Sequence, residues 1–170
     1  MTPLLTALPI PDDSDGLTSL TPGLGAFALI YCEAAERLAE CRSDPGSVDD
    51  IPIVFLYRHA IETSMKHLLI SRGNEFNITT TPNDVLGRSH DLAKQLNDVR
   101  TLAERANKPL SSATEEFIRR FQSSDDTGAG CRYPEAKNGD LIMIEHIASF
   151  SLSTFLAEAR SVTEDRKSVV

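Results

Sequence analysis

The stretch IPIVFLYRHAIETSMKHLLIS, residues 51–71, is the most apolar helix-length run in this chain of 170 residues. Arg58 and Glu62 interrupt it one helical turn apart, each flanked on the helical wheel by large apolar side chains. Charges in such surroundings are costly to bury unless they are paired. The run therefore predicts the central helix of the fold, with a polar network or a site built into it. Its apolar arc has five members: Val54, Tyr57, Ile61, Met65 and Leu68.

Apolar residues recur at three- and four-residue steps through most of the remaining chain, which is typical of amphipathic helices. Ser112 and Glu115 have the spacing of a capping box. Residues 74–89 are expected to be a loop that packs Phe76 and Ile78. The pattern predicts an all-α, up-and-down bundle of about five helices, at residues 25–42, 48–71, 89–107, 112–123 and 140–162. The first of them is expected to bury Phe27, Ile30, Tyr31, Ala34, Leu38 and Cys41, and the fourth Ala113, Phe117 and Phe121.

The chain is expected to form one domain, residues 23–163, between a flexible Pro/Asp-rich tail (1–22) and a polar tail (164–170). No run reaches the roughly 18 apolar residues that a membrane span needs. The N-terminus lacks the basic region of a secretory signal, and three cysteines without CxxC spacing are typical of reduced thiols. We therefore expect a cytoplasmic protein that does not bind membranes.

The net charge of −8, from 25 acidic and 17 basic residues, argues against broad electrostatic binding of nucleic acid and leaves room only for a local basic patch. Walker, GxGxxG, GxSxG, HExxH and zinc-type cysteine motifs are missing from the sequence. His59 and Glu62 have an H-x-x-E spacing, but a metal site in a bundle needs ligands from several helices. We expect neither a metal nor another cofactor.

Arg58, Glu62 and Glu145 are the first candidate group, because Glu145 also falls between apolar residues on the wheel of its own helix. One interpretation is a structural polar network in which Arg58 forks onto one or both carboxylates. The other is a polar pocket near one end of the bundle. The residue pattern leaves both interpretations open.

Two further pairs are candidates for ligand binding. Asp91 suits the start of a helix, where His90 is expected to cap the helix or to contact a neighbouring one, with ligand binding or catalysis as the alternative. Arg132 and Tyr133 lie in a Gly-containing loop, and Pro134 favours an extended backbone at Tyr133. An Arg and a Tyr held in this way suit an anion or a nucleotide, or equally a loop anchored on the bundle.

The last helix is expected to mediate homodimerisation. Besides its main apolar face it carries a second, weaker apolar group on roughly the opposite side, and a helix that is apolar all round is central or faces a partner. This second group consists of Met143, Ile147 and Phe150.

Three segments, YRHAIETSMKHLL (57–69), SHDL (89–92) and CRYP (131–134), followed by a last amphipathic helix, resemble bacterial HEPN-like proteins over about residues 50–160. The resemblance implies an all-α bundle, often dimeric, associated with nucleic acids, toxin–antitoxin pairs or phage defence. Many of these proteins are metal-independent ribonucleases with an Arg followed, after four to six residues, by a His. This chain has no such match, since Arg132 precedes His146 by fourteen positions. The segments carry Arg58, Glu62, His90, Asp91, Arg132 and Tyr133.

We therefore expect a non-catalytic or degenerate HEPN-like module, dimeric, that binds RNA, a nucleotide or a protein partner. The alternative is a metal-independent ribonuclease in which Arg58 or Arg132 stabilises a phosphate and His90 is the general acid/base. A third interpretation is a structural or immunity-type partner that uses its last helix. Whether the chain is an enzyme stays open at this point.

Overall fold

The computed structural model describes residues 21–41, 50–78, 81–87, 90–124 and 157–158. Within these residues the protein is all-α and contains no strand, which confirms the predicted fold class. The elements are α1 (Thr21–Cys41), α2 (Asp50–Arg72), the 3₁₀ turn η1 (Asn74–Phe76), α3 (Pro82–Leu86), α4 (Leu92–Arg105) and α5 (Ser112–Ser124).

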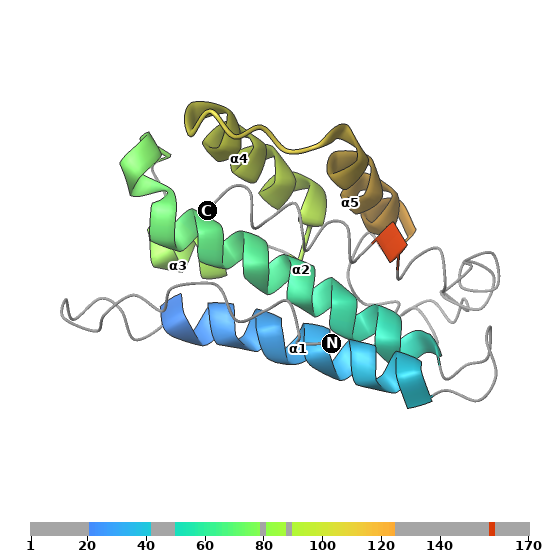
Figure 1. The fold of residues 1–170 in the computed structure, drawn as a ribbon. Coiled ribbons are helices and arrows are strands. Elements are labelled where there is room, and N and C mark those ends of the chain that lie inside the picture. Colours follow the sequence, from blue (N-terminus) through green and yellow to red (C-terminus); the bar gives the residue numbers. More distant parts are fainter. Residues whose placement is uncertain (1–20, 42–49, 79–80, 88–89, 125–156, 159–170) are drawn as a thin grey trace, which may run out of the picture.

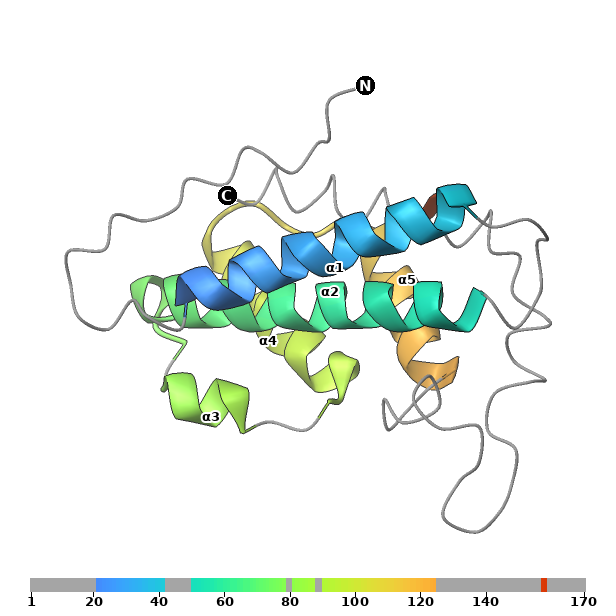
Figure 2. The same ribbon diagram turned by 90° about the horizontal axis from the view of Figure 1, so that it is seen from below.

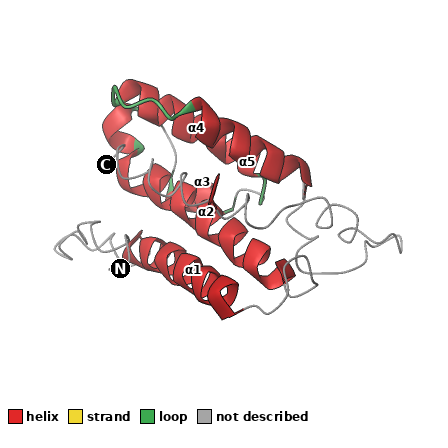
Figure 3. Cartoon of the chain, turned by 45° about the vertical axis from the view of Figure 1, so that its right-hand side comes forward, coloured by secondary structure: helices red, strands yellow, loops and turns green. Residues whose placement is uncertain are grey.

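The helix α2 lies at the centre of the described fold. The helix α1 runs antiparallel to it along one side, and α4 and α5 pack on the opposite side (Figures 1 and 2). A third view, coloured by secondary structure, shows the same layering, with α2 between α1 and the pair α4 and α5 (Figure 3). The apolar stretch 51–71 therefore belongs to the central helix, against which the other helices pack.

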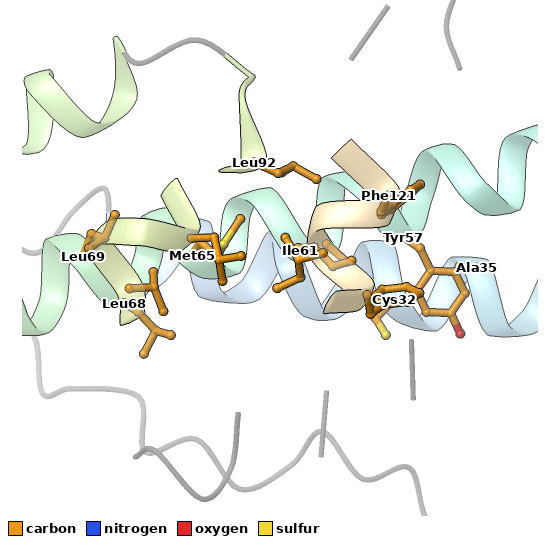
Figure 4. Close-up of a cluster of buried hydrophobic side chains, with 14 of the residues drawn as sticks. Cys32, Ala35, Tyr57, Ile61, Met65, Leu68, Leu69, Leu92 and Phe121 are labelled. Atoms are coloured by element: carbon orange, nitrogen blue, oxygen red, sulfur yellow. The ribbon is translucent and has the colours of Figure 1, made fainter. Parts of the chain in front are cut away.

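The core follows the apolar arc of α2. All five predicted residues of that arc are buried, and side chains from α1, α4 and α5 pack against them (Figure 4). Leu92 comes from the first turn of α4 and Phe121 from the last turns of α5. These contacts bring the start of α4 and the end of α5 to the same face of α2, and the candidate site is built there.

The buried face of α1 is not the predicted one. Phe27, Ile30 and Leu38 are 54%, 57% and 44% exposed, and Cys41 is exposed as well. Small residues face α2 instead, and they allow the two helix backbones to approach closely. Gly25 is an example, because a Cβ there would lie 3.3 Å from ring atoms of His67. The buried residues of α1 are Gly25, Ala28, Cys32 and Ala35.

The segment predicted as a loop before α4 contains two short helices. Thr81 caps α3: its hydroxyl accepts a hydrogen bond from the Asp84 amide, and the Asp84 carboxylate accepts one from the Thr81 amide. This reciprocal capping box, with Pro82 in the first turn, stabilises a helix too short to form alone. The predicted packing of Phe76 and Ile78 against the core is confirmed.

The remaining helix ends agree with the prediction to within a few residues, with one local error. Ser111, and not Ser112, caps α5, since its hydroxyl accepts a hydrogen bond from the Thr114 amide at 3.1 Å. Phe117 and Phe121 are buried as predicted, but Ala113 is exposed, and Thr114 and Ile118 take its place in the core.

The helix predicted at residues 140–162 lies outside the described residues except for Ala157 and Glu158, which are helical. Arg120 of α5 forms an ion pair with Glu158. In the described part of the chain, no helix has the length and hydropathy that crossing a membrane requires.

Candidate functional site

The carboxylate of Glu62 is the centre of a buried polar cluster on α2. The Lys66 ammonium, one turn further along the helix, donates a hydrogen bond to Glu62 Oε1 over 2.8 Å. The imidazole Nδ1 of His90 lies 2.9 Å from Oε1 and 3.1 Å from Oε2 of the same carboxylate. Glu62 and Lys66 are buried, at 4% and 7% exposed. A buried carboxylate is thus held between an ammonium and an imidazole, as burial of charge requires.

The contacts of Glu62 determine its protonation state. Burial alone raises the pKa of the Glu62 carboxyl, but the hydrogen bonds and charges of Lys66 and His90 outweigh burial and hold that pKa below its ordinary value of 4.5. Glu62 is therefore ionised at neutral pH. An ionised carboxylate can only accept hydrogen bonds, so Nδ1 of His90 carries the proton that lies between the two groups.

The lowered pKa of Glu62 makes the stability of the protein dependent on pH. Because the folded-state pKa lies below the unfolded one, the stabilisation is complete above about pH 4.5 and is lost as the pH falls through the folded-state pKa. We expect the Glu62→Gln variant to lose less stability than the wild type between neutral and acidic pH.

This pH dependence is measured by urea unfolding at a series of pH values. The exposed Glu104 of α4, whose side chain is 61% exposed, provides the matched control Glu104→Gln. That control should keep the wild-type pH dependence. Parallel curves for the wild type and Glu62→Gln would contradict the depressed pKa.

His90 presents a half-exposed imidazole just before α4, with 46% of its side chain accessible. With Nδ1 bound to Glu62, the nitrogen left for an external group is Nε2. In the neutral ring Nε2 has a lone pair and can accept a proton, whereas in the protonated ring it donates a hydrogen bond to an anion. A buried carboxylate that fixes the tautomer and orientation of an accessible histidine suits both anion binding and acid–base chemistry.

Arg58 supports His90 through the backbone. It is 2% exposed, and its Nη2 donates a hydrogen bond to the His90 carbonyl oxygen at 2.8 Å. Its guanidinium also lies 5.9 Å from the centre of the Phe121 ring, a cation–π contact with α5. A buried guanidinium in these contacts fixes the position of the His90 backbone and does not face solvent.

Gln122 of α5 connects the same loop to a third helix. Its side-chain oxygen accepts hydrogen bonds from the Leu92 amide at 2.7 Å and from Arg58 Nη2 at 3.5 Å. The Leu92 amide belongs to the first turn of α4, where amides have no partner within the helix. Side chains from α2 and α5 thus hold the backbone at His90 and at Leu92.

Asp91 caps α4 as predicted. Its carboxylate accepts a hydrogen bond from the Lys94 amide at 3.1 Å, and the Lys94 ammonium lies 3.5 Å from the same carboxylate. The Lys94 side chain is 75% exposed. Among the described side chains, the cations Arg58, Lys66 and Lys94 lie beside the carboxylates Glu62 and Asp91; Lys66 pairs with Glu62, and Lys94 pairs with Asp91.

The structure brings Arg58 and Glu62 of the first candidate group together with His90 and Asp91, which the sequence presents as a separate pair, and it changes the predicted pairing. Within the described residues Glu62 pairs with Lys66 and His90, and Arg58 turns to the His90 carbonyl instead of forking onto Glu62. The other predicted members, Arg132, Tyr133 and Glu145, lie outside the described residues.

Sequence reasoning missed two contributors to this site. Lys66 follows Glu62 by four residues, a spacing that favours an ion pair along a helix, so a signal was present. Gln122 has no such signal, because its role depends on how α5 crosses the start of α4. In the part of the chain that the structure describes, no three His, Cys, Asp or Glu side chains gather closely enough to hold a metal ion.

Comparisons of this chain with protein-family models, with curated proteins and with solved structures found no match. The fold and the site alone define the class of protein. It is an all-α helical protein with a surface histidine whose ring is held by a buried carboxylate.

Proposed function

We propose that this protein is a HEPN-like, cytoplasmic module that binds RNA or a nucleotide through a phosphate group at His90. The observation that carries the proposal is the half-exposed His90 imidazole, held at Nδ1 by the buried Glu62 carboxylate. Lys66 already compensates the charge of Glu62, so the protonated imidazole is available to an external anion. The exposed ammonium of Lys94 adds positive charge nearby.

A phosphate ligand is favoured over a protein partner because of the charge of the site. The exposed Lys94 ammonium and the His90 imidazole lie here at the surface, in a chain whose net charge is −8. A local patch of this kind suits one phosphate or a short stretch of RNA, and not a long electrostatic footprint. The resemblance of residues 57–69 and 89–92 to HEPN-like segments points to the same ligand class.

The second candidate function is a metal-independent ribonuclease, and the carboxylate–histidine pair favours it. His90 would be the general acid/base, since the Glu62 carboxylate orients its ring through Nδ1 and Nε2 remains to exchange a proton with the substrate. Arg58 is too deeply buried to contact a substrate phosphate, so stabilisation of the phosphate would fall to another cation such as Arg132.

The proposal also includes a homodimer, which the sequence predicts through Met143, Ile147 and Phe150. Those residues lie outside the described part of the chain.

We expect His90→Ala to weaken binding of a fluorescein-labelled, mixed-sequence single-stranded RNA by about tenfold or more, as loss of a charge-assisted hydrogen bond implies. Fluorescence anisotropy measures the affinity. His67→Gln is the matched control, because His67 lies on another part of α2, against Gly25. It should bind RNA like the wild type.

The same samples, analysed on a denaturing gel, separate the two candidate functions. Intact RNA with wild-type protein supports the binding module. RNA cleaved by the wild type and not by His90→Ala would replace it with the ribonuclease. Equal RNA affinity of the wild type and His90→Ala would overturn the proposed site.

A further inference from the structure

A continuous apolar stripe on α1 faces away from the core. Its members fall within an arc of roughly 100°, the width of a helix-packing face. At 54%, 57% and 44% exposed, Phe27, Ile30 and Leu38 are the large hydrophobic residues that stand out at the surface of the described part. The stripe consists of Phe27, Ile30, Ala34, Leu38 and Cys41. Tyr31 borders it but packs against the core and against the ring of His59 on α2.

The stripe lies on the side of α1 that is turned away from α2. The residues that α1 buries are small and lie on a different arc of the helix: Gly25, Ala28, Cys32 and Ala35. The helix α2 lies along α1 and covers that arc (Figure 2), and the large residues Phe27, Ile30 and Leu38 are exposed. Contiguous exposed apolar surface of this kind marks an interaction site in soluble proteins.

The order of residues along the stripe is symmetric about Ala34. Ile30 precedes Ala34 by four residues and Leu38 follows it by four; Phe27 precedes it by seven and Cys41 follows it by seven. When two copies of α1 pack antiparallel and cross at Ala34, Ile30 of each copy meets Leu38 of the other. The small side chain of Ala34 allows close approach at the crossing point. A surface that is complementary to itself under a two-fold axis is the requirement for an isologous dimer.

The charges beside the stripe have the same symmetry. Arg37 and Glu33 lie along one edge of the stripe, with side chains 79% and 43% exposed. In the antiparallel arrangement Arg37 of one copy lies along this edge about 3 Å, or two residues, from the level of Glu33 of the second copy, within reach of its side chain, and the second copy returns the contact. Opposite charges at the flanks of paired helices determine their orientation. Parallel packing in register would place this edge of the two copies on opposite flanks of the helix pair and lose this exchange.

We propose that α1 is the face through which two copies of this chain associate, antiparallel and centred on Ala34. The inference rests on the homodimer of the proposed function but not on RNA binding. The dimer contact then lies on α1, whereas the sequence predicts a contact through the last helix.

Sedimentation equilibrium of the full chain without RNA tests the inference. The wild type should be a dimer. Ile30→Glu and Leu38→Glu should each be folded monomers by circular dichroism and sedimentation, because each copy would face a buried charge. Ala113→Glu adds the same charge at an exposed position of α5 and should remain a dimer.

A cysteine cross-link tests the orientation. Phe27→Cys should form a disulfide-linked dimer with native Cys41 of the second copy under mild oxidation, and the added change Cys41→Ser should abolish it.

A monomeric wild type would overturn the inference together with the homodimer. A dimer that survives Ile30→Glu and Leu38→Glu but is dissociated by Phe150→Glu would overturn the α1 face alone. It would leave the homodimer through the last helix in place.

Discussion

Glu62→Ala is expected to lower the free energy of unfolding by about 3–5 kcal/mol, the cost of removing one partner from a buried ion pair. The substitution leaves the Lys66 ammonium, 7% exposed, without the carboxylate that now lies 2.8 Å from it. It also removes the acceptor for Nδ1 of His90. Urea unfolding followed by circular dichroism gives the difference.

Two variants show whether the loss of unfolding free energy comes from the Lys66 ammonium that has lost its carboxylate. Glu104→Ala, at an exposed position of α4, should change the unfolding free energy by no more than about 0.5 kcal/mol. Glu62→Leu combined with Lys66→Met replaces both charges by apolar groups and should recover much of the lost stability. A loss for Glu62→Ala as small as that for Glu104→Ala would show that the cluster is not buried in solution.

The second large effect is expected at Arg58. Arg58→Ala should destabilise the protein by about 3 kcal/mol, since hydrogen bonds from a charged donor are worth roughly 1.5–3 kcal/mol and packing is lost as well. The His90 carbonyl and Gln122 lose their common donor, and Phe121 loses the guanidinium beside its ring. Arg58→Lys should recover only part of this, because an ammonium lacks the planar guanidinium that places Nη2 near both acceptors and lies over the Phe121 ring. Thermal and urea unfolding measure both variants.

The Arg58 variants also distinguish two roles of Arg58, namely holding the His90 backbone in place and contacting the ligand directly. Arg119→Ala, on the surface of α5 with a side chain 45% exposed, is the matched control and should be nearly neutral. If Arg58→Ala instead abolished RNA binding while leaving stability unchanged, Arg58 would contact the ligand itself. The buried arrangement described above would then be wrong.

The sequence predicts the α2 core well because periodicity and burial coincide there. Every member of the arc Val54, Tyr57, Ile61, Met65 and Leu68 is buried, since α2 is packed against α1 on one side and against α4 and α5 on the other (Figure 1). In α1 the same reasoning chose the wrong face. That helix has two apolar faces, one large (Phe27, Ile30) and one small (Ala28, Ala35), and periodicity does not distinguish them. Which face packs depends on how closely α1 approaches α2.

For the site, the sequence identifies the residues better than their pairing. Arg58 and Glu62 stand out because charge is costly on an apolar arc, and His90 stands out beside a helix start. Their partners depend on tertiary contacts. The position of α4 brings the His90 ring to Glu62, and the His90 carbonyl is a backbone group that sequence patterns do not reveal as an acceptor for Arg58. The role of Gln122 arises in the same way.

In the proposed site Glu62 holds the proton on Nδ1 of His90, so that Nε2 donates a hydrogen bond to a phosphate when the ring is protonated. Long-range ¹H–¹⁵N NMR of ¹⁵N-labelled protein measures this directly, with His90→Ala used to assign the signals. We expect the neutral ring to carry its proton on Nδ1, and we expect single-stranded RNA to shift the Nε2 signal of His90 and not that of His67. A neutral His90 ring protonated on Nε2, with signals that RNA leaves unchanged, would contradict the proposed site.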